Sequence, residues 1–266
     1  MLTFNPLSLC GYPPFQSMKT QLKTPWIPHI NPNDTVNLRL FCFPYAGGSS
    51  LSFRSWRDRL PDTIGIYPIE LPGRGLRIQE SPMATLHPLI YKLAPSLSPF
   101  LDKPFAFFGH SMGAVIAFEL TRYLRKQHQP QPVRLCVSGR CAPQVHPITP
   151  PIHNLPEPEF LDALRHLNGT PAEVFENPEL LALALPILRA DFSVVETYTY
   201  TDDDPLQCPI SVFGGREDPE TTIAFLEAWK RQTTETMALH LFAGDHFFIH
   251  SHFDELLAVL KQDLSR

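Results

Sequence analysis

Short apolar runs alternate with segments of helical period along most of the chain. Six runs have the length and the β-branched and aromatic content of strands, at 37–43, 64–69, 105–108, 133–138, 209–213 and 238–242. Five segments have a helical pattern, at 52–60, 84–101, 112–127, 219–232 and 251–264. The middle runs are apolar throughout, which is typical of parallel strands with helices on both faces. The alternation predicts a doubly wound α/β fold with a mostly parallel sheet.

One stretch, from about 150 to 200, contains no strand pattern. It holds two helical segments, "PEPEFLDALRHL" and "NPELLALALPILRADFSVVETY", and in the first of them Phe160, Leu161, Leu164 and Leu167 recur at helical spacing. These helices could simply cover the sheet. Alternatively, they form an inserted lid over a pocket at the carboxyl ends of the strands, where a lid would exclude water and shape substrate access.

The composition narrows the class of protein. The chain has 266 residues, a net charge of −5 and 43% hydrophobic residues, which suits one soluble α/β domain and gives no sign of nucleic-acid binding. No run approaches 18 apolar residues, so no membrane span is expected. We expect a monomer with a loosely ordered extension at 1–24 and a single domain at 25–266 that includes the lid.

The five cysteines indicate the cellular compartment of the protein and whether it has a structural metal site. Cys42 and Cys136 stand inside apolar strand-like runs, as reduced and buried thiols do, which predicts a cytoplasmic protein. The sequence contains no C-x-x-C pair, so a structural zinc site is not expected. We expect neither a metal nor a cofactor.

Candidate chemistry begins at "GHSMG", residues 109–113, where a predicted strand meets a predicted helix. G-x-S-x-G in this context is the nucleophile elbow, a sharp turn that exposes the serine hydroxyl above the sheet. Small residues are needed two positions before and after Ser111, because strand and helix pass closely there. The pattern predicts Ser111 as a nucleophile; the alternative is a glycine-rich turn with a helix-capping serine.

A serine hydroxyl needs a base, and in the elbow fold the order along the chain is serine, acid, histidine. His246 follows the last predicted strand and is the expected base. Asp218 follows the preceding strand and is the expected acid, which would hold the imidazole tautomer. Asp218 before Pro219 could instead cap a helix. Other carboxylates nearby are Glu217, Asp245 and Asp202–Asp204, and His246 with His250 could in principle bind a metal.

An oxyanion hole requires two backbone N–H groups. One is expected from Met112, which follows the nucleophile, and the other from the loop "FCFPYAGGSS", at Ala46 or Tyr45. The loop's Gly47 and Gly48 would let the backbone turn in close, although a plain Gly-Gly turn is the alternative.

Six segments together resemble a known family: "LFCFPYAGGSSLSFRSW" (40–56), "ELPGRGLR" (70–77), "GHSMGA" (109–114), "LPILRADF" (185–192), "FGGREDP" (213–219) and "GDHFFI" (244–249). They resemble the type II thioesterases of nonribosomal peptide and polyketide synthases, over residues 38–260. The resemblance implies an α/β-hydrolase fold with a helical lid at about 145–200. It also implies that Ser111, Asp218 and His246 act as nucleophile, acid and base.

The same resemblance implies a substrate: acyl or peptidyl groups on the phosphopantetheine arm of carrier proteins, from which such enzymes remove misprimed or stalled chains. The alternatives are a general carboxylesterase, lipase or medium-chain acyl thioesterase of the same fold, and a non-catalytic hydrolase-fold binding module. Carrier domains are generally acidic and this chain has a net charge of −5, so a local basic or apolar patch is expected to dock them. Arg74, Arg77 and Arg165 are its candidates, or else solvated surface charges.

Overall fold

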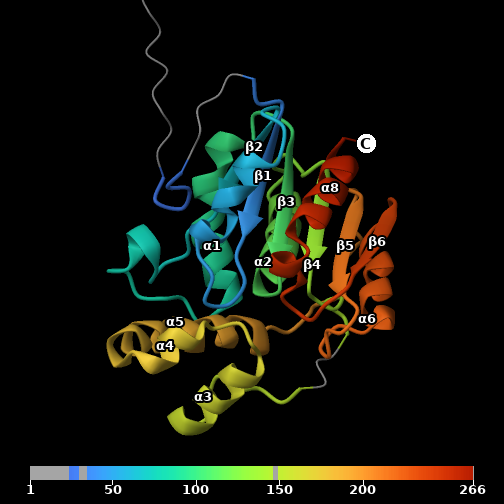
Figure 1. The fold of residues 1–266 in the computed structure, drawn as a ribbon. Helices are drawn as coiled ribbons and strands as arrows, with labels where there is room; N and C mark the ends of the chain where they lie inside the picture. The colour runs from blue at the N-terminus through green and yellow to red at the C-terminus, as the bar shows by residue number, and fades with distance from the viewer. Residues whose placement is uncertain (1–23, 30–34, 146–148, 266) are drawn as a thin grey trace, which may run out of the picture.

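The computed structural model describes residues 24–29, 35–145 and 149–265, so the extension expected at 1–24 lies almost wholly outside the described residues. The described chain forms one sheet (Figure 1). Its strands are β1 (Leu38–Phe43), β2 (Ile64–Pro68), β3 (Phe105–His110), β4 (Arg134–Ser138), β5 (Ile210–Gly215) and β6 (Met237–Phe242). They lie in the order β2-β1-β3-β4-β5-β6, and every neighbouring pair is parallel. The predicted doubly wound, parallel α/β sheet is confirmed.

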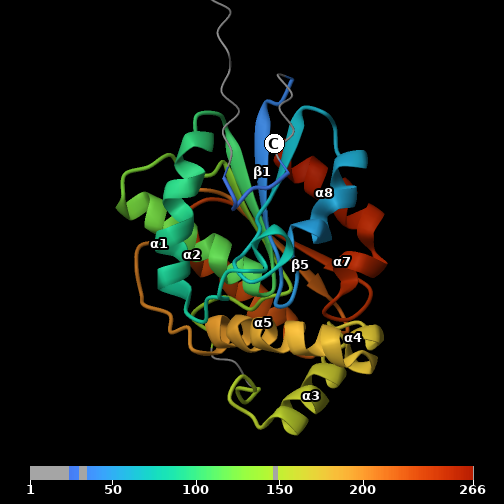
Figure 2. The same ribbon diagram turned by 90° about the vertical axis from the view of Figure 1, so that its left-hand side faces the viewer.

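Helices pack on both faces of this sheet (Figures 1 and 2). One face is covered by α1 (Leu86–Leu97), α2 (Met112–Lys126), α6 (Ile223–Glu227) and the 3-10 helix η4 (Ala228–Gln232). The other is covered by the 3-10 helix η1 (Ser50–Asp58), α7 (Phe248–Ser251) and α8 (Phe253–Leu264). Two further 3-10 turns are η2 (Gly75–Arg77) and η3 (Ser98–Phe100).

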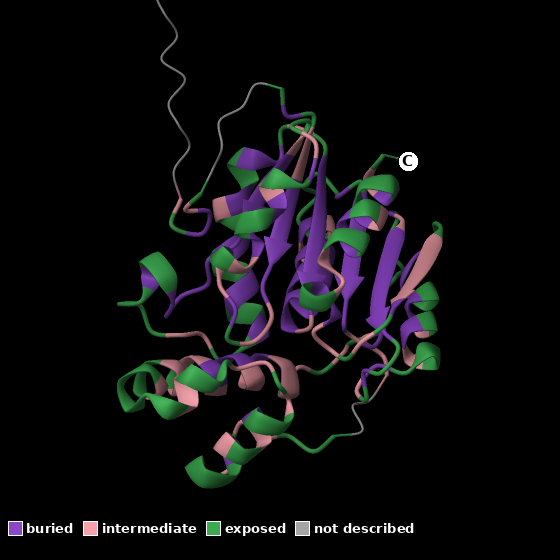
Figure 3. Cartoon of the chain, viewed as in Figure 1, coloured by how far each residue is buried: buried purple, intermediate pink, exposed green. Residues whose placement is uncertain are grey.

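The core consists of two apolar layers, one on each side of the sheet. Along β1, Phe41 and Phe43 face the α1–α2 layer, whereas Leu40 and Cys42 face the η1–α8 layer. Because both faces of the central strands are covered, those strands are apolar at every position. Figure 3 shows them as the buried centre of the molecule. Trp26 is also buried in the first layer, so the chain packs on the domain from just after residue 24.

The expected helices differ from the observed ones mainly at their beginnings. The helix expected at 219–232 begins only at Ile223, with Thr222 as its N-cap, because the preceding residues form a turn around Asp218. The segment expected at 84–101 ends as an α-helix at Leu97 and continues as η3, which contains Pro99. Proline there disfavours a further α-helical turn.

The strandless stretch contains α3 (Glu157–His166), α4 (Ala172–Glu176) and α5 (Pro178–Glu196). All three lie across the carboxyl ends of the strands, where the arrowheads point in Figures 1 and 2. Helix α3 packs against α5 through a small apolar cluster that includes Phe160, Leu164 and Leu188. The helices therefore occupy the position expected of a lid.

Candidate active site

Ser111 stands on a sharp turn between β3 and α2. Its backbone has φ 54° and ψ −113°, a conformation that non-glycine residues adopt rarely and at an energetic cost. A Cβ atom on Gly109 would lie 2.1 Å from the Gly113 carbonyl oxygen, and one on Gly113 would lie 2.1 Å from the Phe43 carbonyl oxygen. Both glycines are therefore required by close approach of the backbone, as the elbow motif predicts.

Two loops at the same edge of the sheet bring His246 and Asp218 together. His246 lies between β6 and α7, and Asp218 lies just after β5. The distance between His246 Nδ1 and Asp218 Oδ2 is 2.7 Å, and the Asp218 side chain is completely buried. Asp218 Oδ1 accepts from the Glu220 N–H at 2.9 Å, and Oδ2 also accepts from the Thr221 hydroxyl at 2.8 Å.

These contacts decide the protonation of the Asp218 carboxyl group. Burial by itself would raise its pKa, but the hydrogen bond and charge of His246 act against burial, as do the donors at Glu220 and Thr221. The net result is a pKa below the usual aspartate value. The carboxyl group is therefore an anion near neutral pH, and it holds the proton of His246 on Nδ1, which leaves Nε2 free to accept one.

The alternative readings of the acidic residues are not supported by the geometry. Asp218 caps no helix, because Thr222 is the N-cap of α6. The Glu217 carboxylate accepts from the Gly244 N–H, and that of Asp245 accepts from the Phe247 N–H. Asp203 forms ion pairs with basic residues at the end of α2.

The turn after β1 is where the second half of the oxyanion hole is expected. Its Gly48 N–H donates to the Tyr45 carbonyl oxygen at 2.9 Å, and its Gly47 N–H donates to Asp191 Oδ2 at 2.8 Å. Within the described residues, no hydrogen bond uses the Ala46 N–H. Ala46 lines the same pocket as Ser111, whereas Met112 is the first residue of α2 and is buried. Tyr45 lines the same pocket, so Ala46 and Tyr45 are both candidates for the second donor.

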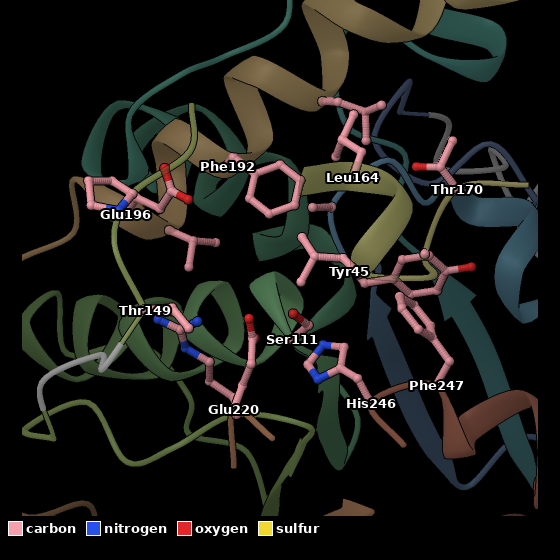
Figure 4. Close-up of a pocket in the computed structure, with 17 residues that line it drawn as sticks. Tyr45, Ser111, Thr149, Leu164, Thr170, Phe192, Glu196, Glu220, His246 and Phe247 are labelled. Atoms are coloured by element: carbon pink, nitrogen blue, oxygen red, sulfur yellow. The ribbon is translucent and has the colours of Figure 1, made fainter. Parts of the chain in front are cut away.

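A pocket of about 300 Å³ opens at these residues. Figure 4 shows Ser111 and His246 on one side and Phe192 and Leu164, from the lid helices, on the other. The lining residues are Tyr45, Ala46, Ser111, Arg140, Thr149, Pro151, Leu164, Leu167, Gly169, Thr170, Leu188, Phe192, Val195, Glu196, Glu220, His246 and Phe247. The pocket is thus largely apolar toward the lid and polar toward the sheet.

Comparison with known proteins agrees with this geometry. The thioesterase-domain family matches residues 38–264, which is most of the chain. The chain belongs to the thioesterase family.

Three similar proteins illustrate the relationship. Linear gramicidin dehydrogenase LgrE of Brevibacillus parabrevis is 47% identical over 85% of this chain and 87% of its own. Gramicidin S biosynthesis protein GrsT of Aneurinibacillus migulanus is 42% identical over 90% of this chain and 93% of its own. The solved structure of YbtT, the type II thioesterase from the yersiniabactin NRPS/PKS biosynthetic pathway, is 30% identical with a TM-score of 0.78, over 86% of this chain and 94% of its own. The family and fold expected from the motifs are confirmed, and the thioesterase is an enzyme that hydrolyses thioesters.

The sequence-based reasoning missed His110, which lies immediately before the nucleophile position. Its side chain is completely buried, its Nδ1 lies 2.9 Å from Ser138 Oγ, and its ring centroid lies 5.1 Å from that of His246. Burial, followed by the charges of His246 and His250, lowers the pKa of His110 well below the usual histidine value. His110 is therefore a neutral packing partner of the site. Its position as the variable residue of G-x-S-x-G carried no signal of this.

His250, the possible partner of His246 in a metal site, has another role. Its Nε2 lies 3.1 Å from the Tyr45 hydroxyl, so it braces the turn after β1. Among the residues that the structure describes, no group of three histidine, cysteine, aspartate or glutamate side chains is arranged to hold a metal.

The prediction of three exposed docking arginines is wrong for two of them. Arg74 is buried and pairs with Asp191, and Arg77 is buried, pairs with Glu80 and stacks over the Trp26 ring at 3.9 Å. Both arginines belong to the segment "ELPGRGLR", and both are buried against partners within the domain. Arg165 alone is exposed, on α3.

The lowered pKa of Asp218 makes a prediction about acid stability. Because its folded-state pKa lies below the unfolded value of about 3.9, the folded state binds this proton less readily. The ionised Asp218 carboxylate stabilises the folded state fully at pH values above the unfolded-state pKa. This stabilisation is lost as pH falls through the folded-state pKa. The difference in unfolding free energy between wild type and Asp218→Asn should therefore shrink between pH 6 and pH 2, measured by urea denaturation.

The control is Ser55→Ala, which changes an exposed side chain on η1 that carries no titratable group. Its effect on unfolding free energy should stay nearly constant over the same pH range. A pH-independent difference for Asp218→Asn would contradict the lowered pKa.

Proposed function

We propose that this thioesterase hydrolyses acyl or peptidyl groups from the phosphopantetheine arm of carrier proteins of nonribosomal peptide or polyketide synthases. The observation that carries the proposal is that Ser111 and His246 line one pocket beneath helices α3–α5, and that Asp218 contacts His246 Nδ1. The gramicidin proteins and the NRPS/PKS pathway named for the similar proteins support this class of substrate.

The proposed reaction proceeds through an acyl-enzyme. Ser111 Oγ attacks the thioester carbonyl carbon while His246 Nε2 takes the hydroxyl proton. The resulting oxyanion accepts hydrogen bonds from the N–H groups of Ala46 and Met112. The C–S bond then breaks, His246 returns its proton to the leaving sulfur, and phosphopantetheine departs as a thiol.

The second half of the cycle regenerates the enzyme. His246 takes a proton from water, whose oxygen attacks the acyl-enzyme carbonyl. The tetrahedral intermediate collapses with release of a carboxylic acid, and Ser111 recovers its proton from His246. Asp218 holds the imidazole in place throughout and stabilises the imidazolium, without itself taking the proton.

The carrier protein is expected to matter through its surface. Acyl-carrier and acyl-coenzyme A substrates present the same phosphopantetheine thioester, so the triad meets identical chemistry in both. A higher kcat/KM for the carrier form must then arise from protein contacts near the pocket mouth. Arg165 on α3 is the exposed cation that remains from the sequence-based candidates, and acidic carrier surfaces complement it.

The proposal is tested by comparing kcat/KM for the same acyl group on a carrier protein and on coenzyme A. The carrier form should be preferred, and added salt should reduce the preference, because exposed charge contacts are screened. Arg165→Glu should lower kcat/KM for the carrier form by about 5- to 10-fold and leave the coenzyme A form unchanged.

A matched charge reversal, Lys261→Glu, serves as the control. Lys261 is exposed on α8, whose carboxyl end lies at the opposite end of the molecule from α3 (Figure 1). It should affect neither substrate. Equal kcat/KM for carrier and coenzyme A forms across several acyl groups would refute carrier recognition and favour a general acyl thioesterase.

Two other functions, ester hydrolysis and dehydrogenation, differ from hydrolysis of carrier-bound thioesters in what they require. A general carboxylesterase would cleave simple esters faster than matched thioesters, which the same assays measure. LgrE is named a dehydrogenase, but this chain has no G-x-G-x-x-G sequence, the fingerprint of dinucleotide sites, and the turn after β3 holds Ser111. Hydrolysis is the chemistry that these residues support.

We further propose that the thioesterase acts in the cytoplasm as a monomer. Cys42, Cys136, Cys141 and Cys208 are buried free thiols, which supports a reducing compartment. No helix within the described ranges is long and apolar enough to cross a bilayer.

A further inference from the structure

A buried ion pair connects the lid helix α5 to the segment after β2, beside the turn after β1. The guanidinium of Arg74 donates to both carboxylate oxygens of Asp191, with Nη1–Oδ2 at 2.6 Å and Nη2–Oδ1 at 2.7 Å. Only 6% of the Arg74 side chain and 2% of the Asp191 side chain are exposed. The two residues are 117 positions apart in the chain, so this contact joins distant segments.

Both partners also hold the backbone of that turn. Asp191 Oδ2 accepts from the Gly47 N–H at 2.8 Å, and Arg74 Nη1 donates to the Gly48 carbonyl oxygen at 3.0 Å. The turn is thus held by hydrogen bonds at two successive residues, directly after Ala46. Helix α5 also packs very closely here, because a Cβ on Gly47 would lie 2.8 Å from Leu188 Cδ2.

Stability alone does not explain this arrangement. A buried ion pair is at best about neutral for folding compared with apolar residues of similar volume, because both charges lose their hydration. The pair instead fixes the orientation of the backbone in one turn, because it offers an acceptor to one residue of the turn and a donor to the next. A fixed backbone orientation is needed where an N–H must point at a reacting atom, as in an oxyanion hole.

We propose that Asp191, clamped by Arg74, is a positioning residue for the oxyanion hole. It holds the Gly47 N–H toward α5, so that the preceding Ala46 N–H stays aimed into the pocket. The inference rests on the proposed hydrolytic function, and it assigns a role to two motifs, "ELPGRGLR" and "LPILRADF", that the triad does not use.

Through the Asp191–Arg74 pair, helix α5 supports the turn of the proposed oxyanion hole, and it also contacts the segment before α3. On its other side, Arg189 Nη1 donates to the carbonyl oxygens of His153 and Leu155, at 2.8 and 2.9 Å. Glu196 accepts from the Ile152 and His153 N–H groups, both at 2.9 Å. Helix α5 therefore holds the oxyanion turn with one set of charges and the entry to α3 with another.

The test is Asp191→Asn, which keeps the side-chain shape but removes the charge that binds Arg74. With an acyl N-acetylcysteamine thioester, kcat should fall by about 10- to 100-fold, part of what one oxyanion donor is worth, while KM stays within about 2-fold. Arg74→Lys leaves the Asp191–Gly47 bond in place but loses the two-pronged contact, so kcat should fall less, by about 3- to 10-fold.

Two further measurements distinguish a positioning role of Asp191 in the oxyanion hole from a purely structural role. An acyl trifluoromethyl ketone forms a tetrahedral oxyanion with the serine, so its affinity for Asp191→Asn should fall in parallel with kcat. The unreactive thioether analogue should bind as it does to wild type. Glu119→Gln is the control, because Glu119 forms a similarly buried ion pair with Arg122 at 2.6 Å, away from the pocket lining. It should lower the melting temperature without changing kcat.

Several outcomes would overturn the clamp: a kcat for Asp191→Asn within 2-fold of wild type, equal losses for both inhibitors, or an equal loss of kcat in Glu119→Gln. Should Asp191→Asn fail to fold, Arg74→Lys decides, and an unchanged kcat in that variant also refutes the proposal. Failure of the proposed function would look different, because wild type would then hydrolyse carrier and coenzyme A forms with equal kcat/KM, a comparison in which the N-acetylcysteamine thioester takes no part.

Discussion

Replacement of Ser111 by alanine is expected to reduce thioester turnover by about 10⁴-fold or more, because the acyl-enzyme can no longer form. The strained turn and the two close-packed glycines position Ser111 at the pocket, as a nucleophile would require. Labelling by a fluorophosphonate should be lost as well. The oxyanion donors remain in the variant. Residual hydrolysis would come from direct attack of water on the thioester, with these donors stabilising the oxyanion.

The fold should survive this change. Among the described residues, the Ser111 hydroxyl forms no hydrogen bond that caps α2, and alanine accepts the same backbone conformation at similar cost. Melting temperature and circular dichroism should match wild type. Ser55→Ala, which changes an exposed serine on η1, is the control and should keep full activity. Near wild-type turnover in Ser111→Ala would show that another residue is the nucleophile.

Replacement of Asp218 by asparagine is the second change with a large expected effect. Asparagine fits the same space but can present an N–H to His246 Nδ1, which favours the wrong imidazole tautomer and removes the charge that stabilises imidazolium. We expect the acylation rate to fall by about 1000-fold or more. Rapid-mixing measurement of thiol release in a single turnover reports this step directly.

The neighbouring acids provide the comparison. Asp245→Asn changes the carboxylate directly before His246, whose side chain accepts from the Phe247 N–H at 2.9 Å. Its acylation rate should stay within a few-fold of wild type. If Asp218→Asn showed normal kinetics with only a shifted melting temperature, Asp218 would be structural and the acid would have to be sought again.

The catalytic motifs could be predicted from the sequence because their physics is local. The sharp strand–helix turn needs small residues at fixed distances from Ser111, and chain order places Asp218 and His246 after successive strands. The parallel sheet follows from strands that are apolar at every position. All of these signals lie within a few residues of the feature they predict.

The failures concern contacts that no local pattern carries. Arg74 sits in a Gly-rich polar segment, and nothing near it indicates that its partner is Asp191, far along the chain. The late start of α6 has a similar origin. The Asp-Pro pair at 218–219 is a standard helix-start signal, but the carboxylate is occupied by His246 and by a local turn, so the helix begins at Ile223. Tertiary partners outcompeted local preference in both cases.

The double anchoring of α5 has a consequence for how such enzymes can be diversified. The pocket has an outer wall from α3 and the loop after it, including Leu164 and Leu167, and an inner wall from α5, including Leu188 and Phe192. The inner wall is hydrogen-bonded to the turn after β1, whereas the outer wall packs on α5 and, at Gly169, against Phe247. Substrate range can therefore be redesigned by grafting residues 156–177 from a relative, provided that Gly169 is kept, whereas grafts that include α5 must carry the matching arginine segment with them.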